Sequence, residues 1–188
     1  ENTTGNNNVA MGYNAMQANT TGVKNVAVGN YALDANTTGE QNTAVGYNAL
    51  SANTSNFNTA IGEGSLSANT TGNRNTALGN NTGSALTTGS LNVIIGDSAG
   101  SALTTTSENT IVGQEALKTA SSGSGNNTVV GYRAAALNTT GNNTVAIGHY
   151  AAYTNTGVAG HIAIGKNAMY TSDGASQTNV AIGFNAMD

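Results

Sequence analysis

The sequence predicts an all-β fold, a parallel β-solenoid, on three observations. One glycine recurs along the whole chain at spacings of 16 to 18 residues, each time after a short apolar run. β-Branched and aliphatic residues stand at fixed positions before that glycine, as in buried strands. Only 7% of the 188 residues are charged. A unit this short buries its apolar residues by stacking on its neighbours, as solenoid repeats do.

The recurring glycine divides residues 1–188 into eleven in-phase repeats, which we expect to form one continuous array without caps. The glycine is expected to end a strand where a side chain would obstruct the bend. The strand-end glycines are Gly12, Gly29, Gly46, Gly62, Gly79, Gly96, Gly113, Gly131, Gly148, Gly165 and Gly183. We interpret the array as an excerpt of a longer fibre. The alternative is a subunit that stacks head to tail, because the last residues run in phase into the first.

Three residues before each glycine form the predicted strand, for example Thr43-Ala44-Val45. Side chains alternate along a strand, so the middle residue faces one side and its two neighbours face the other. The sequence leaves open which side faces the interior. The other side would form an apolar stripe about 50 Å long, from eleven strands at ~4.8 Å. Such a stripe is rarely left exposed, so we expect self-association into a closed ring. The alternative is a wider interior that buries both sides.

An asparagine stands four residues before the glycine in nine of the eleven repeats. Stacked at the strand spacing, such residues can hydrogen-bond from coil to coil. We predict a structural asparagine ladder of Asn8, Asn25, Asn42, Asn58, Asn75, Asn92, Asn109, Asn127 and Asn179.

The rest of each repeat is less definite. The Ala-Leu-x-Ala segment, as in 49–52, is compatible with a second strand or a single helical turn, and the helical turn fits slightly better. The Asn-Thr-Thr-Gly that follows is a turn by composition. Repeats five to eight lose this motif, which indicates that the coil tolerates variation there.

Composition argues against several function classes. The net charge is −4, and the five Lys and Arg are scattered singly, so we expect no nucleic-acid partner. No long apolar run predicts membrane insertion. The chain has no Cys, and its two histidines, His149 and His161, read as substitutions within a scaffold. We therefore expect no enzyme, no catalytic residue, no cofactor and no metal ligand.

The residue directly after the glycine is the most variable one. Four copies are aromatic, and we take Tyr13, Tyr47, Tyr132 and Phe184 as candidate surface-contact residues. Further tyrosines stand close by in the sequence. One interpretation is a ridge for stacking sugars; the preferred one is a corner that tolerates any side chain.

Asn179-Val-Ala-Ile-Gly183 resembles the head repeats of trimeric autotransporter adhesins of the YadA type. Asn42-Thr-Ala-Val-Gly-Tyr-Asn-Ala-Leu50 is similar to repeat arrays of phage tail fibres and large bacterial surface proteins. The resemblance covers the whole chain and implies a homotrimer that forms a rigid shaft or head outside the cell, on a virion or bacterial surface. Its partners would be copies of itself and a host cell-surface glycan or protein. The adhesin repeats are shorter, so each coil here carries extra residues.

These patterns favour a non-enzymatic fibre segment that supplies stiffness and repeated surface contacts. The first alternative is a head-to-tail filament. An ice-binding solenoid ranks lower, because Thr37 and Thr38 are adjacent and would face opposite sides of an extended strand, whereas an ice plane requires Thr-x-Thr on one face.

Overall fold

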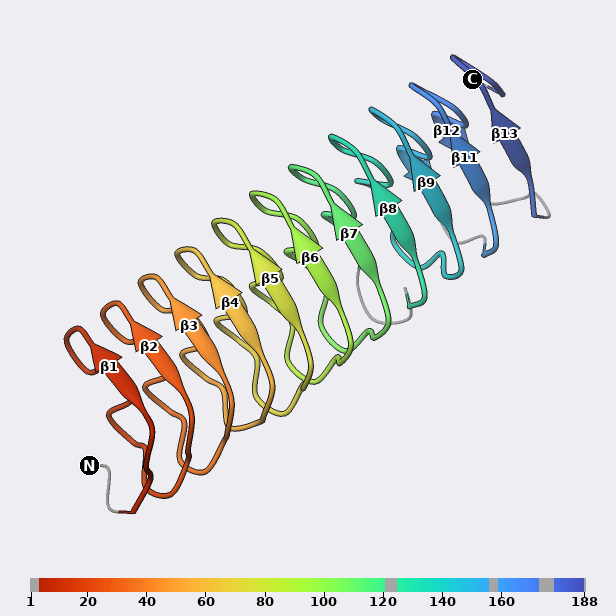
Figure 1. Cartoon of the computed structure of the whole chain (residues 1–188). Coiled ribbons are helices and arrows are strands. Elements are labelled where there is room, and N and C mark those ends of the chain that lie inside the picture. The colour runs from red at the N-terminus through yellow and green to blue at the C-terminus, as the bar shows by residue number, and fades with distance from the viewer. Residues whose placement is uncertain (1–3, 121–124, 156–158, 173–177, 188) are drawn as a thin grey trace.

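Each repeat contributes one three-residue strand, and the strands stack in sequence order along an elongated molecule with its termini at opposite ends (Figure 1). The computed structural model describes residues 4–120, 125–155, 159–172 and 178–187. Eleven strands form one parallel sheet: β1 Val9–Met11, β2 Val26–Val28, β3 Thr43–Val45, β4 Thr59–Ile61, β5 Thr76–Leu78, β6 Val93–Ile95, β7 Thr110–Val112, β8 Thr128–Val130, β9 Val145–Ile147, β11 Ile162–Ile164 and β13 Val180–Ile182. The predicted parallel β-solenoid is confirmed.

The strands pair residue for residue, so equivalent positions of successive repeats lie above one another. Val26 pairs with Thr43, Ala27 with Ala44 and Val28 with Val45, and the same register continues along the sheet. Two shorter strands, β10 Thr154–Asn155 and β12 Thr171–Ser172, form a second parallel pair. The irregular repeat spacing is therefore absorbed outside the strands.

The middle residue of each strand faces the interior, which answers the question that the sequence left open. We call these residues the inward column: Ala10, Ala27, Ala44, Ala60, Ala77, Ile94, Ile111, Val129, Ala146, Ala163 and Ala181. From Ala27 to Ala181 each is at most 2% exposed. Buried residues of the Ala-Leu segment, such as Leu33 and Leu50, belong to the same core. Small side chains fit here because the interior also holds these leucines.

The expected helical turn in the Ala-Leu-x-Ala segment is wrong, and the described residues contain no helix. Asn48 and Leu50 instead adopt left-handed backbone, with φ of 55° and 51°. The alternation of these conformations aims every second N–H at a neighbouring coil: Asn48 N donates to Asn30 O (3.0 Å) and Leu50 N to Ser65 O (3.0 Å). Stacking of coils therefore takes the place of i to i−4 bonding.

In the fifth and sixth repeats a glycine replaces the leucine of the Ala-Leu segment, and other side chains fill the core there. Gly83 stands where Leu66 stands one coil earlier, and Leu86 is buried three residues further on. The strand residue facing this space is Ile94 in place of Ala. A Cβ added at Gly83 would lie 3.0 Å from Ile94 Cδ1. The volume lost where glycine replaces leucine is thus supplied by the isoleucine that replaces alanine in the strand.

Candidate functional site

The outward side of the sheet is a surface of aliphatic residues and threonines that runs along all eleven strands. The residues before and after the inward column form it, and we call them the outward face: Val9, Met11, Val26, Val28, Thr43, Val45, Thr59, Ile61, Thr76, Leu78, Val93, Ile95, Thr110, Val112, Thr128, Val130, Val145, Ile147, Ile162, Ile164, Val180 and Ile182. None of them is buried. In mid-sheet, Ile61 is 39% and Leu78 45% exposed. The prediction that inward and outward residues point to opposite sides of one strand is confirmed.

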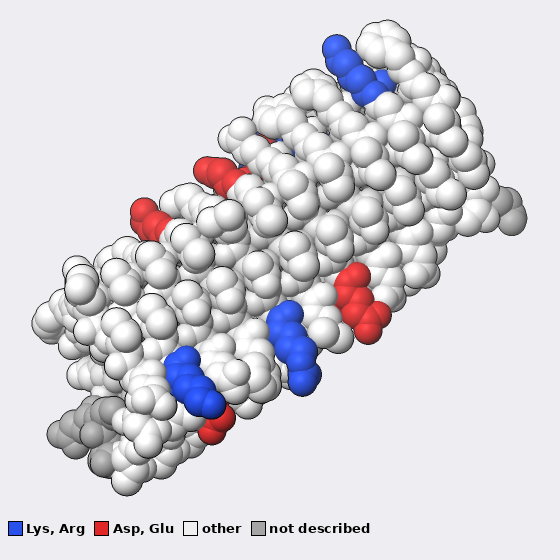
Figure 2. Space-filling model, in the orientation of Figure 1, with Lys and Arg blue, Asp and Glu red and all other residues white. Residues whose placement is uncertain are grey.

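No charged residue belongs to the outward face. Figure 2 has the orientation of Figure 1, and the region of the strands appears there as an uncoloured band. The Lys, Arg, Asp and Glu residues in view lie along the margins of this band. A band of aliphatic and threonine side chains at one fixed spacing offers no reactive group. What it offers is apolar contact area, repeated once per coil.

The predicted asparagine ladder residues link each coil to the next through the main chain. From Asn8 to Asn127, each Oδ1 accepts a hydrogen bond from the main-chain N–H of the equivalent residue one coil on, at 2.9 to 3.1 Å. Asn75 Nδ2 also donates to Gly89 O at 2.8 Å. Because most of these side chains are buried, the two bonds satisfy groups that water does not reach.

A second set of buried asparagines was missed in the sequence, where it was read only as turn residues. It comprises Asn19, Asn36, Asn53, Asn69 and Asn138. Asn36 Nδ2 donates to Gly39 O (3.0 Å), a carbonyl that also accepts from Asn25 Nδ2 (2.8 Å). Two asparagines per coil thus converge on one turn. The available signal was their constant position seven residues after the strand-end glycine.

The four candidate surface-contact residues do not form one site. Tyr13 and Tyr47 each contact Tyr31 edge-on, with ring centroids 5.6 and 5.9 Å apart. Phe184 is 70% exposed, and Lys166 Nζ lies 5.6 Å from its ring centroid. Tyr132 lies further along the solenoid, in a different group of side chains.

That group spans neighbouring coils, and we call it the flank cluster: Glu115, Tyr132, Arg133, Tyr150, Tyr153 and Tyr170. Arg133 Nε donates to Glu115 Oε2 at 2.6 Å, and Lys118 Nζ donates to Glu115 Oε1 at 2.9 Å. The hydrogen bonds from Lys118 and then Arg133 lower the pKa of the Glu115 carboxyl. Tyr150 contacts Tyr132, Tyr153 and Tyr170 with its ring.

His161 is buried at a position of the asparagine ladder. Its Nδ1 accepts a hydrogen bond from Asn179 N at 3.1 Å, so it takes over the role of an asparagine Oδ1. Burial lowers the pKa of His161 below its ordinary value of 6.5. The neutral imidazole is thus the form that the fold accommodates.

We predict that the stability of the chain decreases as the pH falls below 6.5, because the unfolded His161 then takes up a proton that the folded one resists. The melting temperature should fall between about pH 7.5 and pH 5 in the wild type, and His161→Asn should remove most of this change. The exposed His149, replaced by Asn, is the matched control and should leave it intact. An equal pH dependence in His161→Asn and the wild type would contradict the assignment.

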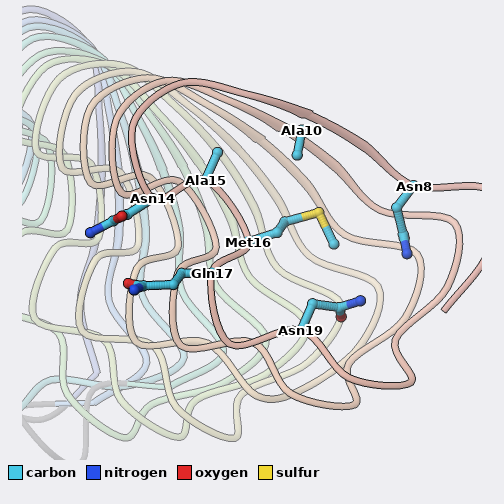
Figure 3. Close-up of a pocket in the computed structure, with 7 residues that line it drawn as sticks. All are labelled: Asn8, Ala10, Asn14, Ala15, Met16, Gln17 and Asn19. Carbon is cyan, nitrogen blue, oxygen red and sulfur yellow. The ribbon is translucent and has the colours of Figure 1, made fainter. Parts of the chain in front are cut away.

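A pocket opens at the first coil, lined by Asn8, Ala10, Asn14, Ala15, Met16, Gln17 and Asn19 (Figure 3). Ala10 and Met16 point into it, and the equivalent Ala27 and Leu33 are buried one coil later. The pocket is therefore the end of the solenoid interior. Within the described ranges, no three His, Asp or Glu side chains lie close enough together to hold a metal ion.

Comparison of the chain with models of protein families, with curated proteins and with solved structures finds no match in any of the three. The described part of the chain has no helix of the length and apolarity needed to cross a membrane. The fold, a repetitive parallel β-solenoid, therefore rests on the strand pairing of the chain itself.

Proposed function

We propose that this chain is a non-enzymatic structural segment of an extracellular fibre, the shaft or head of a phage tail fibre or bacterial adhesin. It assembles as a homotrimer through the outward face. The observation that carries the proposal is the uncharged, solvent-exposed outward face, continuous from Val9 to Ile182. A soluble chain gains from covering an apolar surface of this extent.

A second copy of the chain is the partner that fits this face best. The face repeats once per coil at the strand spacing of ~4.8 Å, and another copy repeats with the same period. Side chains of two copies can therefore interdigitate along their whole length, with no charge to desolvate. A closed ring of identical chains covers the face of every member, which favours the trimer over an open chain of contacts.

The interior supports a mechanical role. Each coil joins the next through strand pairing and through the asparagine side chains, for example Asn58 Oδ1 to Asn75 N at 3.0 Å. Bending the rod would break several of these bonds in each coil at once. Stiffness of this kind suits a spacer that presents many weak contacts to a surface, where avidity replaces single-site affinity.

Light scattering tests the assembly, with a discrete particle of three times 18.6 kDa expected. The double variant Val45→Lys and Val112→Lys places two charges on the outward face and should yield monomers that remain folded by circular dichroism, since both residues are outside the core. Ser67→Lys adds one lysine on the flank, where another coil carries Lys118, and should leave the trimer intact.

Filaments of constant width in electron micrographs would favour the alternative of head-to-tail stacking. A wild-type monomer would contradict assembly through the outward face. The ice-binding alternative is less well supported, because the face pairs threonine with aliphatic residues. In the Asn-Thr-Thr-Gly turns, the hydroxyl of the first threonine is already bonded to the next coil: Thr70 Oγ1 donates to Thr87 O at 3.0 Å.

A further inference from the structure

We propose that the flank cluster is a binding site for a neutral oligosaccharide. This deepens the adhesive part of the proposed function by naming the class of partner, and it does not depend on assembly through the outward face. Three observations carry it: the departure of the cluster from the repeat, the geometry of its rings, and the ion pairs beside them.

The cluster departs from what the repeat needs for folding. Five of its six side chains occupy the second or fifth position after the strand-end glycine, and Tyr132 occupies the first. In the first coil the side chains at the second and fifth positions, Asn14 and Gln17, point to the same side (Figure 3). In four consecutive earlier coils these positions hold only small polar residues or glycine: Asn48, Ser51, Gly64, Ser67, Asn81, Ser84, Ser98 and Ser101. Aromatic and charged side chains are therefore optional for stacking the coils, and their concentration in 115–170 calls for another explanation.

The rings form one contiguous surface. Tyr153 and Tyr170 stack with centroids 5.0 Å apart and planes 20° apart. Tyr150 meets them edge-on at 4.9 and 5.9 Å and meets Tyr132 at 5.5 Å. Tyr150, Tyr153 and Tyr170 remain partly exposed, and Tyr132 is exposed. Tyrosine combines an apolar ring with a hydroxyl, the pairing that a sugar with its C–H faces and hydroxyl groups requires.

The ion pairs supply the polar half of such a site. Arg133 bridges Glu115 and Tyr150, with Nη1 3.5 Å from the Tyr150 hydroxyl, and its guanidinium carbon lies 5.4 Å from the Tyr132 ring centroid. A fixed guanidinium and carboxylate beside aromatic rings can bond adjacent sugar hydroxyls in a defined direction. The carboxylate of Glu115 cancels one of the two positive charges and accepts a hydrogen bond from both Lys118 and Arg133, so neither cation is left unpaired to attract an acidic sugar.

The position of the cluster leaves it accessible in the proposed assembly. Tyr150, Tyr153 and Tyr170 lie beyond the strand-end glycines, on the segment that leads away from the sheet, and none of them belongs to the outward face. A trimer that covers the outward face would thus present three copies of the site to the outside. Weak binding at each copy would add up by avidity.

Ligand-detected saturation-transfer NMR tests the site with four probes, neutral hexasaccharides of glucose, galactose, mannose and N-acetylglucosamine. We expect transfer to at least one of them. The variant Tyr153→Ser with Tyr170→Ser restores the residue found at Ser51 and Ser67. It should bind that hexasaccharide at least about tenfold more weakly, with an unchanged particle mass in light scattering. Tyr31→Asn, which places there the residue found at Asn48, removes the centre of the other tyrosine group and should bind like the wild type.

Two outcomes would overturn the proposal. One is the absence of transfer to all four hexasaccharides. The other is unchanged binding in the double variant together with a lower melting temperature, which would make the rings a stabilising stack alone. Saccharide binding by a chain that stays monomeric would contradict the proposed assembly and leave this site standing.

Discussion

Replacing Gly46 by alanine should reduce the free energy of unfolding by more than ~3 kcal/mol, since backbone strain alone costs about 1–3 kcal/mol there. Gly46 has φ of +137°, a conformation that L residues rarely adopt. A Cβ at this position would lie 2.5 Å from Gly62 O and 2.6 Å from Gly62 C. Neither atom is the end of a flexible side chain, so the two coils must move apart. Urea unfolding followed by circular dichroism measures the change.

Gly183 is the matched control, because it shares the strained backbone without the close approach. Its φ is +132°, and an added Cβ would meet only Ala186 Cβ at 3.9 Å. Gly183→Ala should therefore show the strain cost alone, and the difference between the two variants measures the contact between coils. Equal destabilisation by the two substitutions would be evidence against that contact.

The strand positions and the glycines were predictable because they repeat eleven times in phase. A residue type that recurs at the same position in every repeat is required by the fold, whereas one that occurs once need not be. Which side of the strand faces the interior was harder to predict. Ala44 is smaller than Thr43 or Val45, and choosing it as the inward residue requires knowing that Leu33 and Leu50 already fill the space opposite. That information lies in the packing of a segment whose conformation the sequence left open.

The left-handed conformation in and just before the Ala-Leu segment was not predictable from residue types. Leu50 and Tyr31 adopt φ of 51° and 60°, although leucine and tyrosine have no preference for the left-handed region. Bonds to neighbouring coils impose this conformation against local propensity. The flank cluster had a readable signal: Glu115, Arg133 and Tyr150 are separated by 18 and 17 residues, one coil each, so contact between them follows from the repeat length once the solenoid is accepted.

Replacing Ala44 by leucine should disrupt the stacking of coils. Ala44 is fully buried in the inward column, and Leu33 and Leu50 stand on the Ala-Leu segments directly before and after its strand in the chain. Three added carbon atoms have no space to occupy there, so we expect a loss at or above the upper end of the ~1–3 kcal/mol typical of overpacked cores. Thermal unfolding by circular dichroism and the particle mass by light scattering would both register the change.

Ile94→Leu tests whether the loss at Ala44 comes from volume or from the presence of leucine in this column. Ile94 lies in the same column, but Gly83 and Gly100 take the places of the two leucines, and the isoleucine side chain reaches toward both of them. The exchange conserves volume and should cost less than about 1.5 kcal/mol. If Ala44→Leu melted like the wild type, the interior would have spare room beside Ala44. The compensation between Gly83 and Ile94 would then have no physical basis.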